Sequence, residues 1–408
     1  MILLEGADLV LPDRILTGGA LVIEGDRITD AGRAAPAAAP SLRFDLANHY
    51  VLPGFIDVHV HGVEGMDALA GGSAIADIAE RLPRFGVTAF CPTSIACDPF
   101  ALRTMLNGVR AARTSRPPGG ARVLPAHLES NFISADYKGA QPESCLRAPR
   151  HDSARRSGEA AEAGAFTGQD ILAEIAAARP DVGIVTVAPE VDGVIELIGD
   201  LVAHGHHVSL GHSGATYEQA IEGIRAGARQ ATHLFNRMTP IGHRIPGLAA
   251  AVLESDDVIA ELICDGVHVH PAMMRVALAA KKPERVMAIT DGTAGSGLPR
   301  GSRATIGGRS ITVRDAVYLD DGTLAGSALT MDRAFAKLTS EVGLSLTDAA
   351  IVCATTPARA LGLQGFGVIA PGAIADLVVL DRDLRVMQTW VAGTLAWQRE
   401  DRGDSEKP

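Results

Sequence analysis

Two histidines one residue apart, His59 and His61, stand at the end of the apolar segment LPGFIDVHVHG, residues 52–62. A β-strand turns alternate side chains to opposite faces, so both imidazoles are expected on one face. Neutral imidazole is a common ligand of divalent transition metals, and the pair could therefore bind an ion. Two other interpretations stay open from these residues alone, namely histidines packed in the core and rim histidines bonded to carboxylates.

Four further residues of ligand type end other strand-like segments. Glu129 ends RVLPAHLE, His212 ends HHVSLGH, His233 ends QATH and Asp291 ends VMAITD. Imidazole and carboxylate together form the ligand set that a borderline divalent ion prefers, with a position left for water. Any one of these histidines alone is more often an ordinary polar residue. The prediction of a metal site therefore depends on all six positions jointly.

The elements that must position these residues alternate along residues 51–355. Apolar strand-like runs are separated by amphipathic stretches such as 73–85 and 216–226, a pattern that predicts parallel strands with right-handed crossovers. Eight such strands favour a (β/α)8 TIM-like barrel, in which strand C-termini converge on one face. An open doubly wound sheet is the alternative, weakened because no Gly-x-Gly-x-x-Gly turn follows the first strand.

The two chain ends differ from the middle in their predicted secondary structure. Residues 1–50 and 356–400 contain short strands and glycine turns, including the hairpin-like ALVIEGDRITDAG, and predict one small β-sandwich domain built from both ends. The polar segment 134–165 is expected to be a loop or lid, and 401–408 a charged tail.

Composition limits the function classes. The 408 residues carry a net charge of −11, which argues against nucleic acid or an anionic membrane as the main partner. Neither a secretory signal nor an apolar run of about 18–20 residues is evident in the sequence. The five scattered cysteines predict reduced thiols in a cytoplasmic protein. These features together predict a soluble cytoplasmic enzyme.

Several segments together resemble one family. LPGFIDVHVHG, HLES, VSLGHSGATYEQA, THLFNRMTP, ICDGVHV, AITDGT and LAGSALTMDRAF are similar to the amidohydrolase superfamily, and within it to the N-acetylglucosamine-6-phosphate deacetylase family. The resemblance covers nearly the whole chain. It implies metal-dependent hydrolysis of the acetamide of N-acetylglucosamine 6-phosphate to glucosamine 6-phosphate and acetate. The alternative is another N-acyl amino sugar or its phosphate, such as N-acetylgalactosamine 6-phosphate.

Functions outside this family are less well supported by the sequence. A cyclic-amide hydrolase is disfavoured, because related enzymes commonly use a carboxylated lysine where this chain has Glu129. A non-catalytic sugar-phosphate-binding barrel is disfavoured by Asp291 together with the complete ligand set.

The resemblance also implies site residues. The principal metal would be bound by Glu129, His212 and His233, and a second ion by His59 and His61. The cofactor is thus one or two divalent ions per subunit, zinc first, with iron, manganese or cobalt as alternatives.

Catalytic and substrate-binding roles follow from the same resemblance. Asp291 corresponds to the general acid/base, with a ligand-only role as the alternative, and His268 to the residue that polarises the amide carbonyl. Phosphate binding falls to Arg244 and Asn236, with Arg237 as either a phosphate contact or a solvated rim charge. The remaining sugar contacts are Ala140, Leu324, Ala325 and Gly326. A homodimer with the lid near its interface is expected.

The chain departs from the family pattern at Ser130 and Asn131, at Gln141 and at Gly292. We expect none of these to touch the metal ligands and all to lie near the sugar, so that they affect specificity rather than hydrolysis.

Overall fold

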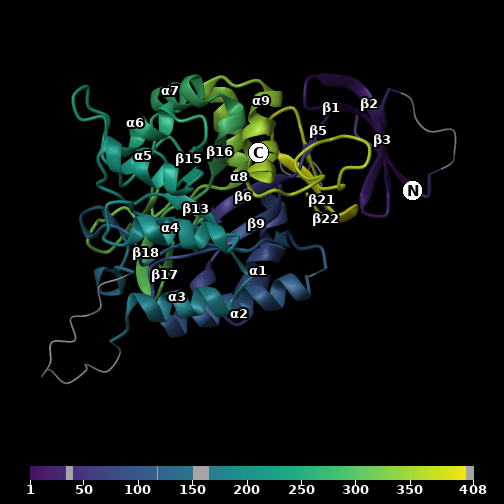
Figure 1. The fold of residues 1–408 in the computed structure, drawn as a ribbon. Helices are drawn as coiled ribbons and strands as arrows, with labels where there is room; N and C mark the ends of the chain where they lie inside the picture. Colours follow the sequence, from purple (N-terminus) through teal and green to yellow (C-terminus); the bar gives the residue numbers. More distant parts are fainter. Residues whose placement is uncertain (34–39, 117, 150–164, 401–408) are drawn as a thin grey trace, which may run out of the picture.

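The computed structural model describes residues 1–33, 40–116, 118–149 and 165–400. A barrel surrounded by helices forms the larger part, and a sheet built from both chain ends lies beside it (Figure 1). The predicted charged tail 401–408 and part of the predicted lid, 150–164, lie outside the described residues. Among the described residues, no helix combines the length and apolar character that a membrane span requires.

Eight parallel strands make the barrel, which confirms the predicted fold class. Adjacent strands pair in chain order, β9 also pairs with the two-residue strand β10 (Arg122–Val123), and the ring closes where Val60 forms a parallel bridge with Gly292. The barrel strands are β6 (Phe55–Val60), β9 (Val87–Ser94), β11 (Ala126–Glu129), β12 (Val182–Val187), β13 (His207–Leu210), β14 (Gln230–Ala231), β15 (Ile259–Ile263) and β16 (Val286–Ile289).

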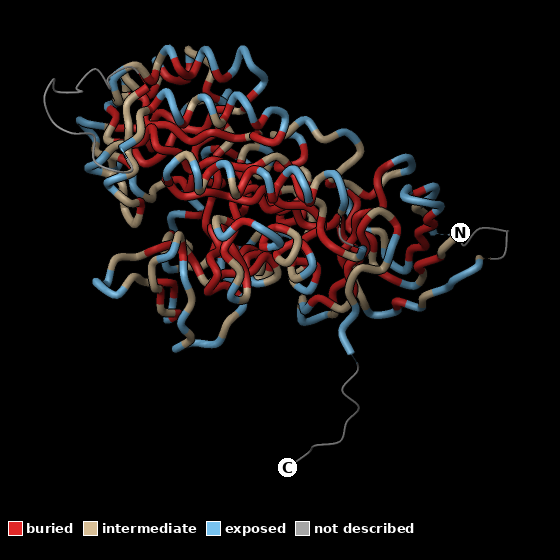
Figure 2. The backbone as a smooth tube through the Cα atoms, turned by 90° about the horizontal axis from the view of Figure 1, so that it is seen from below, coloured by how far each residue is buried: buried red, intermediate tan, exposed pale blue. Residues whose placement is uncertain are grey.

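Barrel strands are buried on both faces. Every residue of β6 and of β9 is buried, as expected for parallel strands covered by helices outside and by side chains inside. Figure 2 shows this pattern for the whole chain, with buried backbone at the centre and exposed backbone along the outer edges. The inward side chains therefore sit in a water-poor interior, where a polar group requires a partner.

The helices cover the barrel with their apolar faces. In α1, the residues Ala74, Ile75, Ile78 and Ala79 are buried, which is the spacing of one helix face. Capping boxes at Thr167 and Thr216 begin α3 and α5. The predicted helices 73–85 and 216–226 correspond to α1, continued by a 3₁₀ turn, and to α5. The helices are α1 (Ala74–Arg81), α2 (Pro99–Thr114), α3 (Gly168–Ala177), α4 (Val194–Ala203), α5 (Tyr217–Ala226), α6 (Gly247–Glu254), α7 (Pro271–Lys281), α8 (Met331–Lys337), α9 (Leu346–Ala350) and α10 (Thr356–Ala360).

Shorter helical turns connect these elements. Five of them within the described residues are 3₁₀ turns, and two π-helical segments, Leu338–Val342 and Ile351–Thr355, extend α8 and join α9 to α10. The 3₁₀ turns are Ala68–Ala70, Leu82–Phe85, Ala135–Tyr137, Glu143–Cys145 and Pro283–Arg285.

Strands from the two chain ends form one hydrogen-bonded sheet. β5 joins the ends, because it pairs with β1 on one side and with β20 on the other. A second core, with Leu9, Val51 and Trp390 among its members, packs against this sheet. Its strands are β1 (Ile2–Val10), β2 (Ile15–Glu24), β3 (Arg27–Gly32), β4 (Leu42–Asp45), β5 (Tyr50–Pro53), β20 (Leu377–Leu380), β21 (Val386–Val391) and β22 (Thr394–Gln398). The domain boundaries at 50 and 356 stay a prediction.

A small antiparallel insertion between β16 and α8 was not predicted from the sequence. It consists of β17 (Arg303–Ile306), β18 (Arg309–Val313) and β19 (Val317–Leu319), and its apolar residues pack with Ile95 and Ala325. A shorter hairpin, β7 (Gly62–Val63) with β8 (Met66–Asp67), follows the first barrel strand.

Candidate metal centre and active site

The six predicted ligand-type residues meet at the C-terminal end of the barrel. Glu129 is at the centre, with one carboxylate oxygen, Oε1, 2.8 Å from His212 Nε2 and 2.9 Å from His233 Nε2. Its other oxygen, Oε2, lies 3.5 Å from His61 Nε2, and the His59 and His61 Nε2 atoms are 3.2 Å apart. The prediction that both rings of the first strand face the same way is therefore correct.

Three of these residues are held in a left-handed backbone conformation. His212, His233 and Asp291 have φ values of 48°, 34° and 48°. Each stands two residues beyond the end of its strand, where the chain turns away from the barrel. Such a conformation is uncommon and costly for residues with a Cβ, and it recurs at functional sites. The strand ends thus turn these side chains over the barrel mouth.

The protonation pattern leaves nitrogen lone pairs directed at the cluster. His212 Nδ1 lies 2.9 Å from the Tyr137 carbonyl oxygen, which only accepts, so this nitrogen carries the proton and Nε2 is free to coordinate. Without a cation between them, the His212 and His233 Nε2 atoms, 3.0 Å apart, would need a shared proton. Nitrogen ligands about 2.0–2.1 Å from a tetrahedral zinc ion lie roughly 3.3 Å apart. The donor set and spacing therefore fit a divalent ion.

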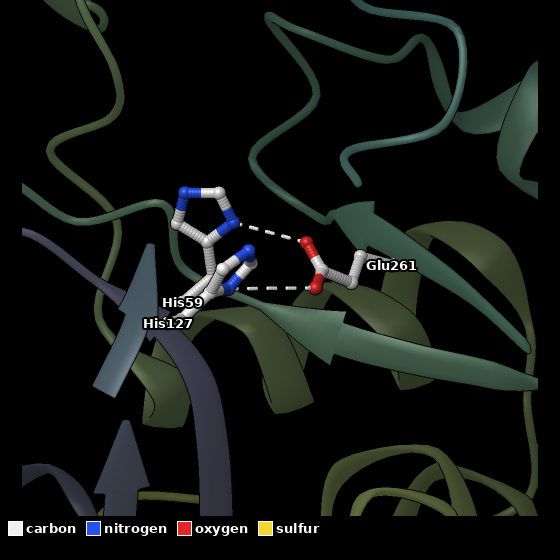
Figure 3. Close-up of side chains that lie close together, drawn as sticks. All are labelled: His59, His127 and Glu261. Atoms are coloured by element: carbon white, nitrogen blue, oxygen red, sulfur yellow. Dashed lines mark hydrogen bonds and ion pairs between the residues drawn. The ribbon is translucent and has the colours of Figure 1, made fainter. Parts of the chain in front are cut away.

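Figure 3 shows the carboxylate that orients the deepest of these imidazoles. Glu261 is fully buried on β15, and its Oε2 accepts from His59 Nδ1 at 2.9 Å. The other oxygen lies 3.7 Å from His127 Nδ1, which donates instead to the Val58 carbonyl oxygen at 2.9 Å. His127 Nε2 is also taken, by Thr186 Oγ1 at 2.8 Å. Because Glu261 accepts from Nδ1 of His59, the proton of that ring is on Nδ1, and its Nε2 faces the cluster.

Two groups of residues could each hold an ion, and both include Glu129. One group is His59, His61 and Glu129, and the other is Glu129, His212 and His233. In a third group, His59, His127 and Glu261, the candidate ligand atoms also lie within 4.8 Å of one another, but both nitrogens of His127 already have hydrogen-bond partners. The first two groups are therefore the better candidates.

Electrostatics at the cluster favour a positive charge. Burial opposes ionisation of Glu129, yet the charges and hydrogen bonds of His212 and His233 hold its pKa well below the usual range. Burial likewise opposes the protonation of His233, but Glu129 raises the pKa of that imidazole to about 9. A site that retains a proton against burial attracts a cation at the same place.

A cavity opens at the metal-ligand cluster, and both Asp291 and His268 line it. Asp291 Oδ1 is 3.2 Å from His61 Nε2 and 3.4 Å from His59 Nε2. Burial raises the pKa of Asp291, but these imidazoles outweigh it, and the net shift is downward. His268 Nδ1 donates to Asp265 Oδ2 at 2.6 Å, which leaves its Nε2 for a ligand.

Most predicted substrate contacts line this cavity. Ala140, Asn236, Arg237, His268, Leu324, Ala325 and Gly326 all contribute to its wall. Gly326 approaches Asp291 closely, because a Cβ there would lie 3.0 Å from the Asp291 carbonyl oxygen and 2.7 Å from Thr293 Cγ2. Arg244 is the exception, since it is exposed on the loop before α6 and is not part of the wall. Within one chain, Arg244 is not brought to the site.

One expectation about the departures from the family pattern is wrong. Gln141 does touch the metal ligands, because its Nε2 donates to Glu129 Oε2 while its Oε1 accepts from the Ala96 amide. Ser130 and Asn131 hydrogen-bond to backbone carbonyls, of Thr186 and of Cys97 and Cys145, and they do not line the cavity. Gly292 lies outside the wall too, and its carbonyl accepts from His61 and Gly62 amides.

Sequence reasoning missed two residues of the site. Arg309, on the insertion strand β18, lines the cavity, and its buried Nε has no hydrogen-bond partner among the described residues. The sequence around Arg309 shows no clear strand pattern and therefore gives no signal that this arginine lies at the site. Glu261 gave a weak signal, because a carboxylate inside the apolar run IAELI needs a buried partner.

Comparisons with known proteins agree with this geometry. A model of the amidohydrolase family matches residues 50–396. N-acetylglucosamine-6-phosphate deacetylase of Mus musculus is 36% identical over 410 residues, covering 96% of this chain and 95% of the relative. N-acetylgalactosamine-6-phosphate deacetylase of Escherichia coli O157:H7 is 34% identical, covering 91% of this chain and 94% of the relative.

One similar solved structure also matches nearly the whole chain. It is the N-acetyl-D-glucosamine-6-phosphate deacetylase of Mycobacterium smegmatis, in an aspartate-to-alanine mutant complexed with N-acetyl-D-glucosamine-6-phosphate. It is 33% identical with a TM-score of 0.85, and the match covers 97% of this chain and 99% of that chain.

Proposed function

The chain belongs to the amidohydrolase family, and on that basis we propose that it hydrolyses the acetamide of N-acetylglucosamine 6-phosphate to glucosamine 6-phosphate and acetate. The observation that carries this is the convergence of four imidazoles on Glu129 beside Asp291. Relatives that share about a third of their residues over nearly full length are named for this activity.

The metal-binding residues are Glu129, His212 and His233 for the principal ion, and His59 and His61 with Glu129 for a second one. Zinc is the first choice, because imidazole and carboxylate suit it, with iron, manganese and cobalt as alternatives. When bound, such an ion supplies an acidified water and a Lewis acid for the amide carbonyl.

Asp291 moves the proton in the reaction. Its carboxylate stays ionised beside His59 and His61, so it can accept a proton from the attacking water. It then delivers that proton to the amide nitrogen as the C–N bond breaks, which makes the amine a workable leaving group. His268 is held by Asp265 and faces the same cavity, and with both ring nitrogens protonated it donates from Nε2 toward the carbonyl oxygen as negative charge develops there.

Substrate phosphate is bound at the outer wall of the cavity. Arg237 and Arg309 bring two guanidinium groups to this wall, and Asn236 adds a polar group beside them. The planar guanidinium fork suits phosphate oxygens, and these cations offset the acidic balance of the chain. Arg244 remains a predicted phosphate contact that would have to come from a second copy of the chain.

The working form of the enzyme is a homodimer in the cytoplasm. Ile241 and Ile245, on either side of Arg244, are 48% and 69% exposed, which suits burial against a second copy. All five cysteines are free thiols, which suits a reducing compartment.

Acetate release from a panel of N-acetylated hexosamines, with and without a 6-phosphate, tests the proposal. The chelated protein is reconstituted with zinc, iron, manganese or cobalt before each assay. We expect the highest kcat/KM on N-acetylglucosamine 6-phosphate and a strong dependence on its phosphate. Absence of acetate release from every sugar with every metal contradicts the proposal.

The second candidate substrate is N-acetylgalactosamine 6-phosphate. The galactosamine-specific relative is almost as similar as the glucosamine-specific ones, and Gln141 alters the surroundings of Glu129. The two sugars differ only in the orientation of one hydroxyl. Their kcat/KM ratio in the same panel decides between them.

A further inference from the structure

A second cavity lies at the opposite end of the barrel from the metal ligands. Its wall comes from segments before β11, β12 and β13, whereas the ligands follow the C-terminal ends of strands. At about 3.3 Å per residue, the length of β12 separates the two ends by roughly 16 Å. The cavity measures about 510 Å³, which is within the range of small-molecule sites.

Basic side chains dominate this wall. Three arginines and three histidines contribute to it, and no carboxylate does among the described residues: Arg113, Arg122, Arg179, His204, His206 and His207. The whole chain carries a net charge of −11, so a cavity with this lining departs from the average surface. Arginine side chains in a wall without carboxylates favour an anionic ligand.

Part of the basic lining has structural partners. The helices α2, α3 and α4 end at this face, and their C-terminal carbonyl groups attract donors. His204 Nδ1 donates to the Asp200 carbonyl oxygen at 2.7 Å, and Arg113 pairs with Asp181 and donates to the Pro180 carbonyl oxygen at 3.0 Å. His204 and Arg113 therefore already have hydrogen-bond or ion-pair partners within the protein.

The two other arginines keep donors available. Arg122 pairs with Asp376 Oδ1 at 3.7 Å and lies over the Phe366 ring, 5.0 Å from its centroid, but its buried Nε has no hydrogen-bond partner in the described chain. Arg179 makes neither an ion pair nor a hydrogen bond with any described residue and is exposed at the cavity rim. His206 Nδ1 donates to the Val182 carbonyl oxygen at 3.0 Å, so the proton of the neutral ring is on Nδ1 and not on Nε2. Burial and the charge of Arg179 both lower the pKa of His206, so these groups are close neighbours.

We propose that this cavity binds a small organic phosphate, with the phosphate held by Arg122 and Arg179 and the carbon body packed against Leu361 and Leu363. The guanidinium forks of these two arginines match the oxygens of a phosphate. The volume far exceeds that of a phosphate ion, and both leucines contribute apolar wall. This site does not depend on the proposed hydrolysis at the other end.

Isothermal titration calorimetry of the full-length protein with glycerol 3-phosphate tests this site, with inorganic phosphate and citrate as comparison anions. Arg179→Gln and Arg122→Gln should each weaken glycerol 3-phosphate binding roughly tenfold. Because Arg179 is exposed, its variant should fold even if Arg122→Gln does not. Arg14→Gln, an exposed arginine in the turn between β1 and β2, is the matched control and should bind as the parent does.

A second control separates the two ends of the barrel. Arg309→Gln alters the cavity at the metal ligands and should leave glycerol 3-phosphate binding unchanged. Binding that is lost in Arg309→Gln and kept in both cavity variants overturns the proposal. Equal affinity for citrate or for inorganic phosphate overturns the assignment to an organic phosphate.

Discussion

At the scale of single residues, the directions of the His59 and His212 imidazoles depend on the groups that accept from their Nδ1 atoms. Glu261 accepts from His59 Nδ1 at 2.9 Å, and the Tyr137 carbonyl oxygen accepts from His212 Nδ1 at the same distance. The nitrogens facing Glu129 are therefore set by residues that do not themselves coordinate. Losing such a partner should weaken the binding of an ion without removing any ligand.

Glu261→Ala should weaken the ion bound by His59 and His61 by roughly 10- to 100-fold, because His59 loses its acceptor. Titration of the chelated protein with zinc, followed by the bound fraction, measures this change. Glu261→Gln is the matched control, because its side-chain oxygen can still accept from Nδ1 and should preserve most of the affinity. Unchanged zinc affinity in Glu261→Ala would show that His59 needs no such support.

Arg309→Gln should raise KM for the phosphorylated sugar roughly tenfold and leave kcat nearly unchanged. The reason is that a phosphate contact far from the reacting bond stabilises substrate and transition state equally. Arg303→Gln is the control in the same insertion, where the guanidinium is exposed and paired with Asp320 at 2.8 Å. Steady-state kinetics on both variants check this. Equal KM values for the two variants contradict the role of Arg309.

At the scale of elements, short segments after the strands determine the site. The chain leaves β13, β14 and β16 through left-handed residues, and the loop 324–327 supports the last of these by a hydrogen bond between Ser327 and Asp291. The Ser327 amide donates to the Asp291 carbonyl oxygen at 2.9 Å. Close packing of these two segments therefore positions the predicted proton carrier.

Gly326→Ala should reduce kcat and destabilise the protein by about 1–3 kcal/mol more than Gly322→Ala. Both glycines have positive φ, 74° and 85°, so the backbone penalty is similar. Only at position 326 does the added methyl group meet neighbours, including the Asp291 carbonyl oxygen at 3.0 Å, whereas nothing lies within 4 Å at position 322. Urea unfolding and kinetics of the pair give the difference. Identical behaviour of both variants would mean that the loop yields freely.

The sequence predicted the barrel strands and the residues that end them, because apolar runs and terminal polar groups are visible in one dimension. It did not reveal the positive φ of His212, His233 and Asp291, since none of these three positions is itself a glycine. It also missed β17–β19, whose strands of three to five residues are too short for a clear alternation. The contact of Gln141 with Glu129 depends on how a loop folds back, which spacing alone does not specify.

At the scale of the whole molecule, one chain leaves an arginine of the predicted site exposed between two apolar side chains. Ile245 is 69% exposed and Ile241 is 48% exposed, on the loop that carries Arg244. Exposed aliphatic groups beside an arginine that is predicted to bind substrate favour an interface with a second copy.

Ile245→Asp should convert the proposed dimer to a monomer, because a buried unpaired carboxylate is strongly unfavourable. Sedimentation velocity of the variant measures this. Phe100→Asp is the control, since Phe100 is 75% exposed on α2 and should leave the assembly unchanged. A parent protein that sediments as a monomer would contradict the proposed dimer.

The most direct measurement of the central claim is an anomalous difference map, collected at the zinc absorption edge from crystals of the zinc-loaded protein. We predict a peak within about 2.0–2.2 Å of a Glu129 oxygen and of His212 and His233 Nε2. Loss of that peak in Glu129→Ala would support the assignment further. A map without a peak among these three residues, in crystals that hold zinc elsewhere, would contradict it.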